Sequence, residues 1–273
     1  MSRRILYLLL ALLLFSVSFS ASAGIVEPNA PPAIADNLWV TNERVHTAQV
    51  VGNTLYLGGN FTYVGPPTGF GAGIDASTAA VDLALPPING IVYAVASDGA
   101  GGWFVGGSFS LVGGFPRSNL VHITGNKTVD PNWNPAPNQV VRVLSVSGGT
   151  LYAGGSFTFI GGAARNRIAA LNAVTGLAAP WNPNASDTVF TILPLGGLVY
   201  VGGEFSTIGG ASRPNLAALD ASTGLSTAWN SNVDFAVFAL AASIDTLYVG
   251  GTFSQAGGQT RNRLAAFDLA NGT

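Results

Sequence analysis

The chain has 273 residues, of which 48% are hydrophobic and only 9% charged, and it contains no cysteine. The lack of cysteine excludes disulfides, thiolate metal sites and cysteine nucleophiles. Eleven Lys and Arg residues against thirteen Asp and Glu residues leave no basic excess, and because neutralising phosphates takes clustered Lys and Arg, we expect no nucleic-acid partner.

The N-terminal residues have the pattern of a secretory signal. Residues 1–4 are basic, residues 5–17 are apolar, and Ala21-Ser22-Ala23 is a small-x-small cleavage site. We therefore predict a signal peptide over residues 1–23 and an extracytoplasmic protein, whether secreted, periplasmic or on the cell surface, with no membrane association after cleavage. The alternative is an uncleaved anchor, because the apolar stretch approaches the ~20 residues that span a bilayer.

A Gly-Gly-x-Phe motif recurs every 48 residues in the rest of the chain. Its copies begin at Gly58, Gly106, Gly154, Gly202 and Gly250. The same 48-residue step relates three further sets of residues, which we call ladders. The aromatic ladder is Tyr56, Phe104, Tyr152, Tyr200 and Tyr248. The arginine ladder is Arg117, Arg165, Arg213 and Arg261, and the tryptophan ladder is Trp133, Trp181 and Trp229. Self-similarity at a fixed period of this length indicates a repeat architecture. The first copy departs from the pattern, with Gly69 and Leu85 in the arginine and tryptophan positions.

Each repeat contains the signals of four short strands. Residues 189–193 and 198–201 are apolar segments joined by a turn with Gly196-Gly197, and residues 216–219 form a third segment that ends in a hairpin loop. A fourth strand is expected around Trp229. Four strands in about 48 residues is the content of a propeller blade, so we predict an all-β fold, a five-bladed β-propeller of four-stranded antiparallel blades.

The last repeat carries a family resemblance. Residues 247–253 read Leu-Tyr-Val-Gly-Gly-Thr-Phe, followed by Gly257-Gly258, Arg261 and Leu-Ala-Ala-Phe-Asp over residues 264–268. This pattern resembles the bacterial delta-sixty repeats, a kelch-like propeller family related to the propeller domain of fungal cortical cell-polarity markers. The resemblance extends over residues 45–273. It implies a propeller fold but no particular activity, because the family is defined by its blades.

Ring closure is the next expectation. The fifth repeat lacks a fourth strand of its own, and residues 35–41, with Trp39, stand where such a strand belongs. We predict that this segment pairs into the last blade, since an unpaired edge strand invites aggregation. The domain would then cover residues 35–273, behind a proline-containing leader over residues 24–34. The alternative is that the chain is a piece of a longer ring or array.

Function is expected where the copies disagree, and one matched position near the start of the five first strands carries different residues from copy to copy. Allowing one residue of slip at Tyr93, they are His46, Tyr93, Arg142, Phe190 and Phe238. Because innermost strands line the channel of a propeller, we predict that these side chains converge at one mouth and bind a glycan, a peptide or a cell-surface partner. The alternative is that they plug the channel or pack between blades, since strand alternation directs them to either face.

Carboxylates are the candidates for a second function, that of a carbohydrate-active enzyme, because glycan hydrolysis needs an acid and a base or nucleophile on either side of the scissile bond. The repeated Asp75, Asp220 and Asp268 are expected to form turns. The candidates are the unrepeated acids Glu43, Asp187, Glu204 and Asp234. Their alternative role is that of solvated loop carboxylates.

The sequence favours a monomeric binding module over an enzyme. His46 and His122 are the only histidines, too few with no cysteine for a zinc site or for a copper-radical oxidase, so we expect neither a metal nor a cofactor. We expect the ladder arginines to fix loops by bonding to neighbouring carbonyls. A third hypothesis is a structural repeat module within a larger surface protein.

Overall fold

The computed structural model describes residues 41–62, 64, 70–82 and 84–273. Regular structure in this part of the chain is entirely β and is built from antiparallel pairs, with no helix. Among the described residues, therefore, nothing could cross a membrane as a long apolar helix. The expected signal peptide (1–23), leader (24–34) and nearly all of the expected closing strand (35–41) lie outside the described residues and stay predictions.

Five sheets repeat one antiparallel plan, in which a first strand pairs with a second and the second pairs with a third. The first strands are β1 (Val45–Val51), β5 (Ile91–Ser97), β10 (Val141–Ser147), β15 (Val189–Leu195) and β20 (Val237–Ala242). The second strands are β2 (Thr54–Gly59), β6 (Trp103–Ser108), β11 (Thr150–Gly155), β16 (Leu198–Gly203) and β21 (Thr246–Gly251). The third strands are β3 (Gly71–Asp75), β9 (Leu120–Ile123), β14 (Ile168–Asn172), β19 (Leu216–Asp220) and β24 (Leu264–Asp268). We number the sheets 1 to 5 in this order.

The predicted fourth strand is mostly reduced to a single bridge, which corrects the expectation of four-stranded sheets. Sheet 1 alone has a regular one among the described residues, β4 (Val81–Asp82). In sheets 2, 3 and 4 one bridge replaces it, namely Ile123 with Val129, Leu171 with Ala178, and Leu219 with Ser226. Sheet 3 shows why pairing stops: Arg165 Nη2 donates to the Ala179 carbonyl over 2.7 Å, and the next residue, Pro180, has no N–H to extend the ladder.

Short outer hairpins, which the sequence analysis did not anticipate, accompany sheets 2 to 5. They are β7 (Leu111–Val112) with β8 (Phe115–Pro116), β12 (Phe159–Ile160) with β13 (Ala163–Ala164), β17 (Thr207–Ile208) with β18 (Ala211–Ser212), and β22 (Gln255–Ala256) with β23 (Gln259–Thr260). In β12–β13 the two turn residues Gly161 and Gly162 have φ of 61° and 78°. Positive φ at both central residues is what a type I′ hairpin turn requires, and it accounts for the second glycine pair of the repeat.

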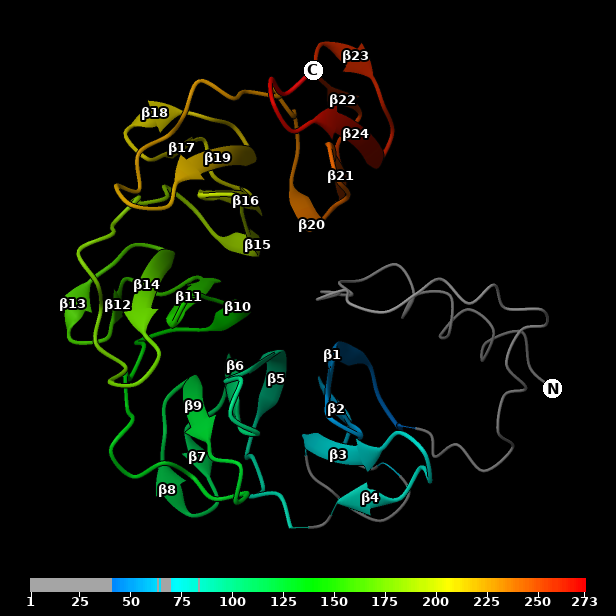
Figure 1. Ribbon diagram of the computed structural model, residues 1–273, viewed down its shortest axis with the longest axis vertical. Helices are drawn as coiled ribbons and strands as arrows, with labels where there is room; N and C mark the ends of the chain where they lie inside the picture. Colours follow the sequence, from blue (N-terminus) through cyan, green and yellow to red (C-terminus); the bar gives the residue numbers. More distant parts are fainter. Residues whose placement is uncertain (1–40, 63, 65–69, 83) are drawn as a thin grey trace, which may run out of the picture.

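The sheets follow one another around a common centre, with the first strands innermost (Figure 1). Each first strand lies beside the next, β1 with β5, β5 with β10, β10 with β15 and β15 with β20. The hydrophobic core is therefore divided into layers between consecutive sheets. Between sheets 3 and 4, for example, Tyr152 and Ile168 of one sheet pack with Val189 and Phe205 of the next. Full burial of one such side chain contributes about 1.5–3 kcal/mol.

The ladder residues tie neighbouring segments together. The indole Nε1 of Trp181, which follows sheet 3, donates to the Asp220 carbonyl of sheet 4 over 3.1 Å, and Trp133 and Trp229 make the equivalent bonds to Ala173 and Asp268. The arginine expectation is confirmed for three ladder members, which donate to carbonyls 13 or 14 residues further along the chain: Arg117 to Asp130, Arg165 to Ala179 and Arg213 to Thr227.

The turn-forming role expected of the repeated aspartates is also confirmed. One oxygen of Asp220 accepts hydrogen bonds from the backbone N–H and hydroxyl of both Ser222 and Thr223. These hydrogen bonds lower the pKa of Asp220 to about 2. Asp75 is held in the same way by Ser77 and Thr78. These carboxylates are occupied by their own turns.

Sheets 5 and 1 do not pack against each other in this structure, and the arc of sheets stays open between them (Figure 1). Tyr248 and Leu264 of sheet 5 are 46% and 67% exposed, whereas the equivalent Tyr200 and Leu216 of sheet 4 are 2% and 1% exposed. The face of sheet 5 on which a following sheet would pack is thus uncovered among the described residues, and the predicted closure remains a prediction.

Candidate functional site

A β-bulge near the start of every first strand positions the five predicted binding residues. In β10, Val141 pairs with Gly155 and Val143 with Gly154, so that Arg142 is the extra residue between them. The same irregularity falls at His46, Tyr93, Phe190 and Phe238. A bulge leaves one residue unpaired and re-aims its side chain. These side chains are therefore released from the ladder at the same point of each sheet.

The Gly-Gly-x-Phe motif explains the bulge. A Cβ on Gly155, the second glycine of its pair, would collide with the backbone oxygen of Val140. The same collision would occur at the second glycine of the other sheets, for example between Gly203 and the oxygen of Thr188. Glycine permits such a close backbone approach because it has no Cβ. The repeated glycine pair thus places the unrepeated residue that follows a valine near the start of each first strand.

The five bulge residues form one continuous row of contacts in chain order, which we call the bulge row. The ring centroids of His46 and Tyr93 are 4.9 Å apart, and those of Phe190 and Phe238 are also 4.9 Å apart. Arg142 bridges the two pairs: its Cζ lies 5.2 Å from the centroid of the Tyr93 ring and 5.6 Å from that of Phe190. The structure thus brings together the residues that the repeat comparison singled out.

The bulge row opens onto a cavity of about 460 Å³ between the five first strands, which we call the channel. All five first strands contribute to its wall, and its neutral polar lining includes Gln49, Ser145, Ser147 and Thr191. No Asp or Glu is among the lining residues, which all belong to the described part of the chain. A concave site of 300–1,000 Å³ with aromatic walls and a few polar groups is typical of ligand pockets.

Arg142 and His46 are the two residues of the bulge row that can carry charge. Arg142 makes no hydrogen bond or ion pair with any described residue, and its Nε is buried without an acceptor. His46 is held differently, because its Nε2 lies 2.6 Å from the Asn60 amide oxygen. Nε2 is therefore the donor, which leaves Nδ1 to accept when the ring is neutral. The sequence analysis missed Asn60, although its place in the first Gly-Gly-x-Phe copy could have shown it.

The four candidate catalytic acids are dispersed, and no hydrogen bond or ion pair joins any two of them. Asp187 accepts from the N–H and hydroxyl of Thr188. Glu204 precedes Phe205 at the end of β16, and Glu43 lies before β1. Asp234 accepts from the backbone N–H groups of Ser254 and Gln255.

Asp234 has a structural counterpart in other sheets. The side chain of Asn138 accepts the matching bonds from Thr158 and Phe159, and Ser186 does so in sheet 4. Burial raises the pKa of Asp234, but the hydrogen bonds from Gln255 and Ser254 outweigh it, and the pKa lies below its ordinary value. A general acid requires a raised pKa, so we assign Asp234 a capping role.

Comparisons with known proteins identify the fold. Residues 245–273 match a family described as "Domain of unknown function (DUF5122) beta-propeller". No curated protein sequence matches the chain significantly. The solved structures of a chain in the mitotic checkpoint complex and of the Neurospora crassa Pan2 WD40 domain both superpose with a TM-score of 0.54. The checkpoint-complex chain is 15% identical in sequence, and the superposition covers 93% of this chain and 74% of that one. The Pan2 domain is 14% identical, and the superposition covers 84% of this chain and 63% of the Pan2 domain.

The computationally designed Ika8 protein is a further structural neighbour. It superposes with a TM-score of 0.53 at 12% identity, over 84% of this chain and 72% of its own. Identities this low carry the fold alone. This chain is an all-β protein of the β-propeller type.

A second polar cluster, which the sequence analysis did not predict, lies in sheet 2. His122 Nε2 lies 3.0 Å from an oxygen of Asp98, and its Nδ1 lies 3.0 Å from an oxygen of Asp130. The imidazole stacks on Phe104, with ring centroids 4.7 Å apart. The equivalent residues of sheets 3, 4 and 5 are all alanine, which is the signal that could have revealed it. Neither this cluster nor any other group of three His, Asp or Glu side chains among the described residues has an arrangement that could hold a metal ion.

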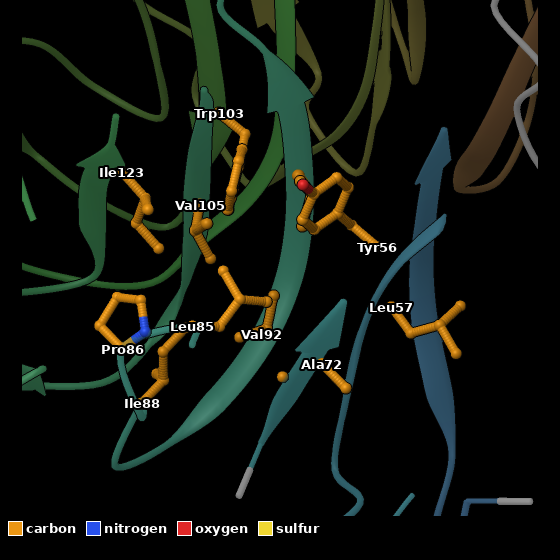
Figure 2. Close-up of a pocket in the computed structure, with 12 residues that line it drawn as sticks. Tyr56, Leu57, Ala72, Leu85, Pro86, Ile88, Val92, Trp103, Val105 and Ile123 are labelled. Carbon is orange, nitrogen blue, oxygen red and sulfur yellow. The ribbon is translucent and has the colours of Figure 1, made fainter. Parts of the chain in front are cut away.

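A small cavity of about 30 Å³ between sheets 1 and 2 is not a ligand site (Figure 2). Its walls are apolar and include Leu57, Leu85, Val92 and Trp103. Leu85 stands in the tryptophan position of the repeat, and the ring of Trp103 lies tilted against that of Tyr56, with ring centroids 4.2 Å apart. Trp181 has the corresponding ring partner, Tyr152, at 5.3 Å. Trp103 therefore takes over the ring contact that Leu85 cannot make.

Proposed function

We propose that this chain is an extracytoplasmic binding module, a five-bladed β-propeller that holds a glycan, a peptide or a cell-surface partner at its channel. The observation that carries the proposal is the bulge row, where four aromatic or imidazole rings meet one arginine that has no hydrogen-bond acceptor among the described residues. The repeats share their glycine, aromatic and arginine ladders but vary at the bulge position, as expected where a rigid scaffold presents a specific site.

The geometry favours binding over glycan hydrolysis. A retaining glycosidase needs two carboxyl groups about 5–5.5 Å apart, and an inverting one needs about 6.5–9.5 Å. None of the described residues that line the channel is an acid, and Asp234 is engaged in capping a loop. Nothing in the described part of the chain therefore favours the enzyme hypothesis.

Binding to arrayed glycans and peptides tests the proposed function. Purified protein is compared with the variants Arg142→Ala and Phe190→Ala, and with Phe159→Ala as control, because Phe159 is exposed on the outer hairpin β12–β13 and does not line the channel. We expect the two channel variants to lose the retained ligand by at least about tenfold in affinity while the control binds normally. Absence of any ligand, or equal loss in the control, would refute the proposal.

The proposal includes a closed ring in which sheet 1 follows sheet 5. A Cβ on Gly106 would lie 2.7 Å from Val141 Cγ1 of the following sheet, and the equivalent glycines of sheets 1, 3 and 4 face Val92, Val189 and Val237 in the same way. At Gly250 the nearest heavy atom to such a Cβ is 3.6 Å away, in Ala239 of its own sheet. Val45 is the equivalent valine of sheet 1, and we propose that it fills this notch when the ring closes.

Export is the remaining part of the proposal. The basic, apolar and small-residue segments of residues 1–23 support cleavage before Gly24. N-terminal sequencing of protein recovered from outside the cytoplasm should begin at Gly24. An intact Met1 on the protein in the membrane fraction would support the anchor alternative instead.

A further inference from the structure

Arg142 differs from the ladder arginines in what its guanidinium does. Arg165 donates from Nη1 to the Ala164 carbonyl and from Nη2 to the Ala179 carbonyl. Arg213 makes the same two bonds to Ser212 and Thr227. The Nη atoms of these arginines bond to backbone carbonyls of their own repeat, while their Nε atoms, like that of Arg142, are buried without an acceptor. Arg142 donates to no described residue, and its only close partners are the rings of Tyr93 and Phe190.

The surroundings of Arg142 leave its charge uncompensated. No described residue that lines the channel is an acid, and the Tyr93 and Phe190 rings flank the guanidinium of Arg142, which is partly buried. A partly desolvated cation without an acceptor is unfavourable. A planar guanidinium bonds best to a carboxylate, which can accept two parallel N–H groups. The missing partner is therefore an anion supplied by the ligand.

The rest of the lining indicates the class of molecule that carries this anion. Tyr93, Ser145 and Thr191 make no side-chain hydrogen bond with any described residue, so their hydroxyls are available at a wall that also bears the Phe190 and Phe238 rings. Neutral hydroxyl donors and acceptors beside apolar ring faces suit a molecule with hydroxyl groups on one side and C–H groups on the other. A pyranose has this character.

Resting on the proposed function, we infer that the channel binds a carboxylated sugar, a uronic acid residue whose carboxylate pairs with Arg142 and whose ring packs against the phenylalanine pair. Gln49, on the wall formed by sheet 1, adds a further neutral hydrogen-bonding group. A neutral sugar would leave Arg142 unpaired, so the channel should discriminate against it. A volume of about 460 Å³ sets the scale at one or two sugar rings.

Calorimetric titration with oligogalacturonate, and with the matched neutral galactose oligomer, tests this inference. Wild-type protein should bind the acidic oligomer at least about tenfold more tightly, and added salt should reduce this preference, because exposed charges are screened. Arg142→Gln should abolish the preference without lowering the unfolding temperature. Arg263→Gln removes an equal charge from an exposed arginine outside the channel and should retain the preference.

The outcomes separate this inference from the proposed function. Equal affinity for the acidic and neutral oligomers, or a preference that survives Arg142→Gln, would overturn the inference. Binding of an acidic peptide but of neither oligomer would overturn the sugar class. In each case, a ligand that binds Phe159→Ala but no longer binds Phe190→Ala would still support the channel as a binding site.

Discussion

Val141 of sheet 3 packs into the notch left by the missing side chain of Gly106 in sheet 2, with its Cγ1 2.7 Å from where a Cβ would lie. Gly106→Ala should destabilise the protein by about 1–3 kcal/mol, since an added methyl in a packed core forces its neighbours apart. Gly250→Ala is the matched substitution in sheet 5, because the cross-strand partner of each glycine within its own sheet is an alanine, Ala94 for Gly106 and Ala239 for Gly250. If the ring is closed, Gly250→Ala should lower the free energy of unfolding by about as much as Gly106→Ala. Urea unfolding of the two variants measures both losses.

Val45 provides the control for this prediction. If Val45 fills the notch at Gly250, then Val45→Ala should relieve part of the cost of Gly250→Ala, and the two changes should show a coupling of about 0.5–3 kcal/mol. A fully tolerated Gly250→Ala, with no coupling to Val45, would mean that the arc stays open in solution.

Leu85 and Trp103 have exchanged roles relative to the other repeats, which predicts a compensating pair. Trp103→Leu restores an aliphatic residue at its position but removes a 2% exposed indole, and should cost about 2 kcal/mol by enlarging the cavity. Leu85→Trp alone should also destabilise, by about 1–3 kcal/mol, because two indoles would compete for the Tyr56 ring.

The double variant should be more stable than the sum of the single changes allows, by at least about 1 kcal/mol. Thermal unfolding of the four proteins gives the coupling directly. Strict additivity would show that Trp103 does not replace the missing tryptophan.

Replacing Arg213 by glutamine should destabilise the protein, whereas the same substitution at Arg142 should leave its stability almost unchanged. Arg213→Gln removes charge-assisted bonds to the Ser212 and Thr227 carbonyls, and because the side chain is only partly buried we expect a loss of about 1 kcal/mol. Arg142→Gln breaks no hydrogen bond and should change stability by less than about 0.5 kcal/mol. Chemical denaturation distinguishes the two roles, and equal losses would place Arg142 among the structural arginines.

The repeat made much of the architecture predictable, because residues that recur at a fixed step must meet equivalent neighbours. The arginine-to-carbonyl bonds and the aspartate turns are of this kind. The slip at Tyr93 was also visible in the sequence, and the structure gives its origin: Val92 pairs with Gly107, one residue away from the 48-residue step.

Features that depend on contacts between distant segments escaped prediction. The bulge arises because Gly155 approaches the backbone of Val140 across the sheet, which no local pattern records. The fourth strand was overestimated because the Arg165 side chain takes a carbonyl that a ladder would have used. The alternation of side chains along a strand could not predict which way the bulge row points, because a bulge interrupts that alternation.

The His122 cluster combines three segments that lie apart in the chain and predicts a pH-dependent contribution to stability. Burial raises the pKa values of Asp98 and Asp130, but the hydrogen bonds from His122 and from nearby backbone N–H groups outweigh it, so that both pKa values lie below their ordinary value. Carboxylates with lowered pKa values stabilise the folded protein fully above their unfolded pKa, which is about 3.9, and this stabilisation is lost as the pH falls through the folded values.

His122→Ala copies the alanine of the other repeats but leaves two partly buried carboxylates without their shared donor. We expect a loss of about 2 kcal/mol near pH 6 that shrinks as the pH falls toward 2, because acid removes the same stabilisation from the wild-type protein. Other aspartates with a lowered pKa, such as Asp220, are present in both proteins, so their contributions cancel in the difference between the two free energies of unfolding. Urea unfolding between pH 2 and pH 6 measures it, with His122→Ala in an Asp98→Asn, Asp130→Asn background as the control, where the cost should be small at every pH. A pH-independent loss would mean that His122 acts by filling space beside Phe104 and not through its two carboxylates.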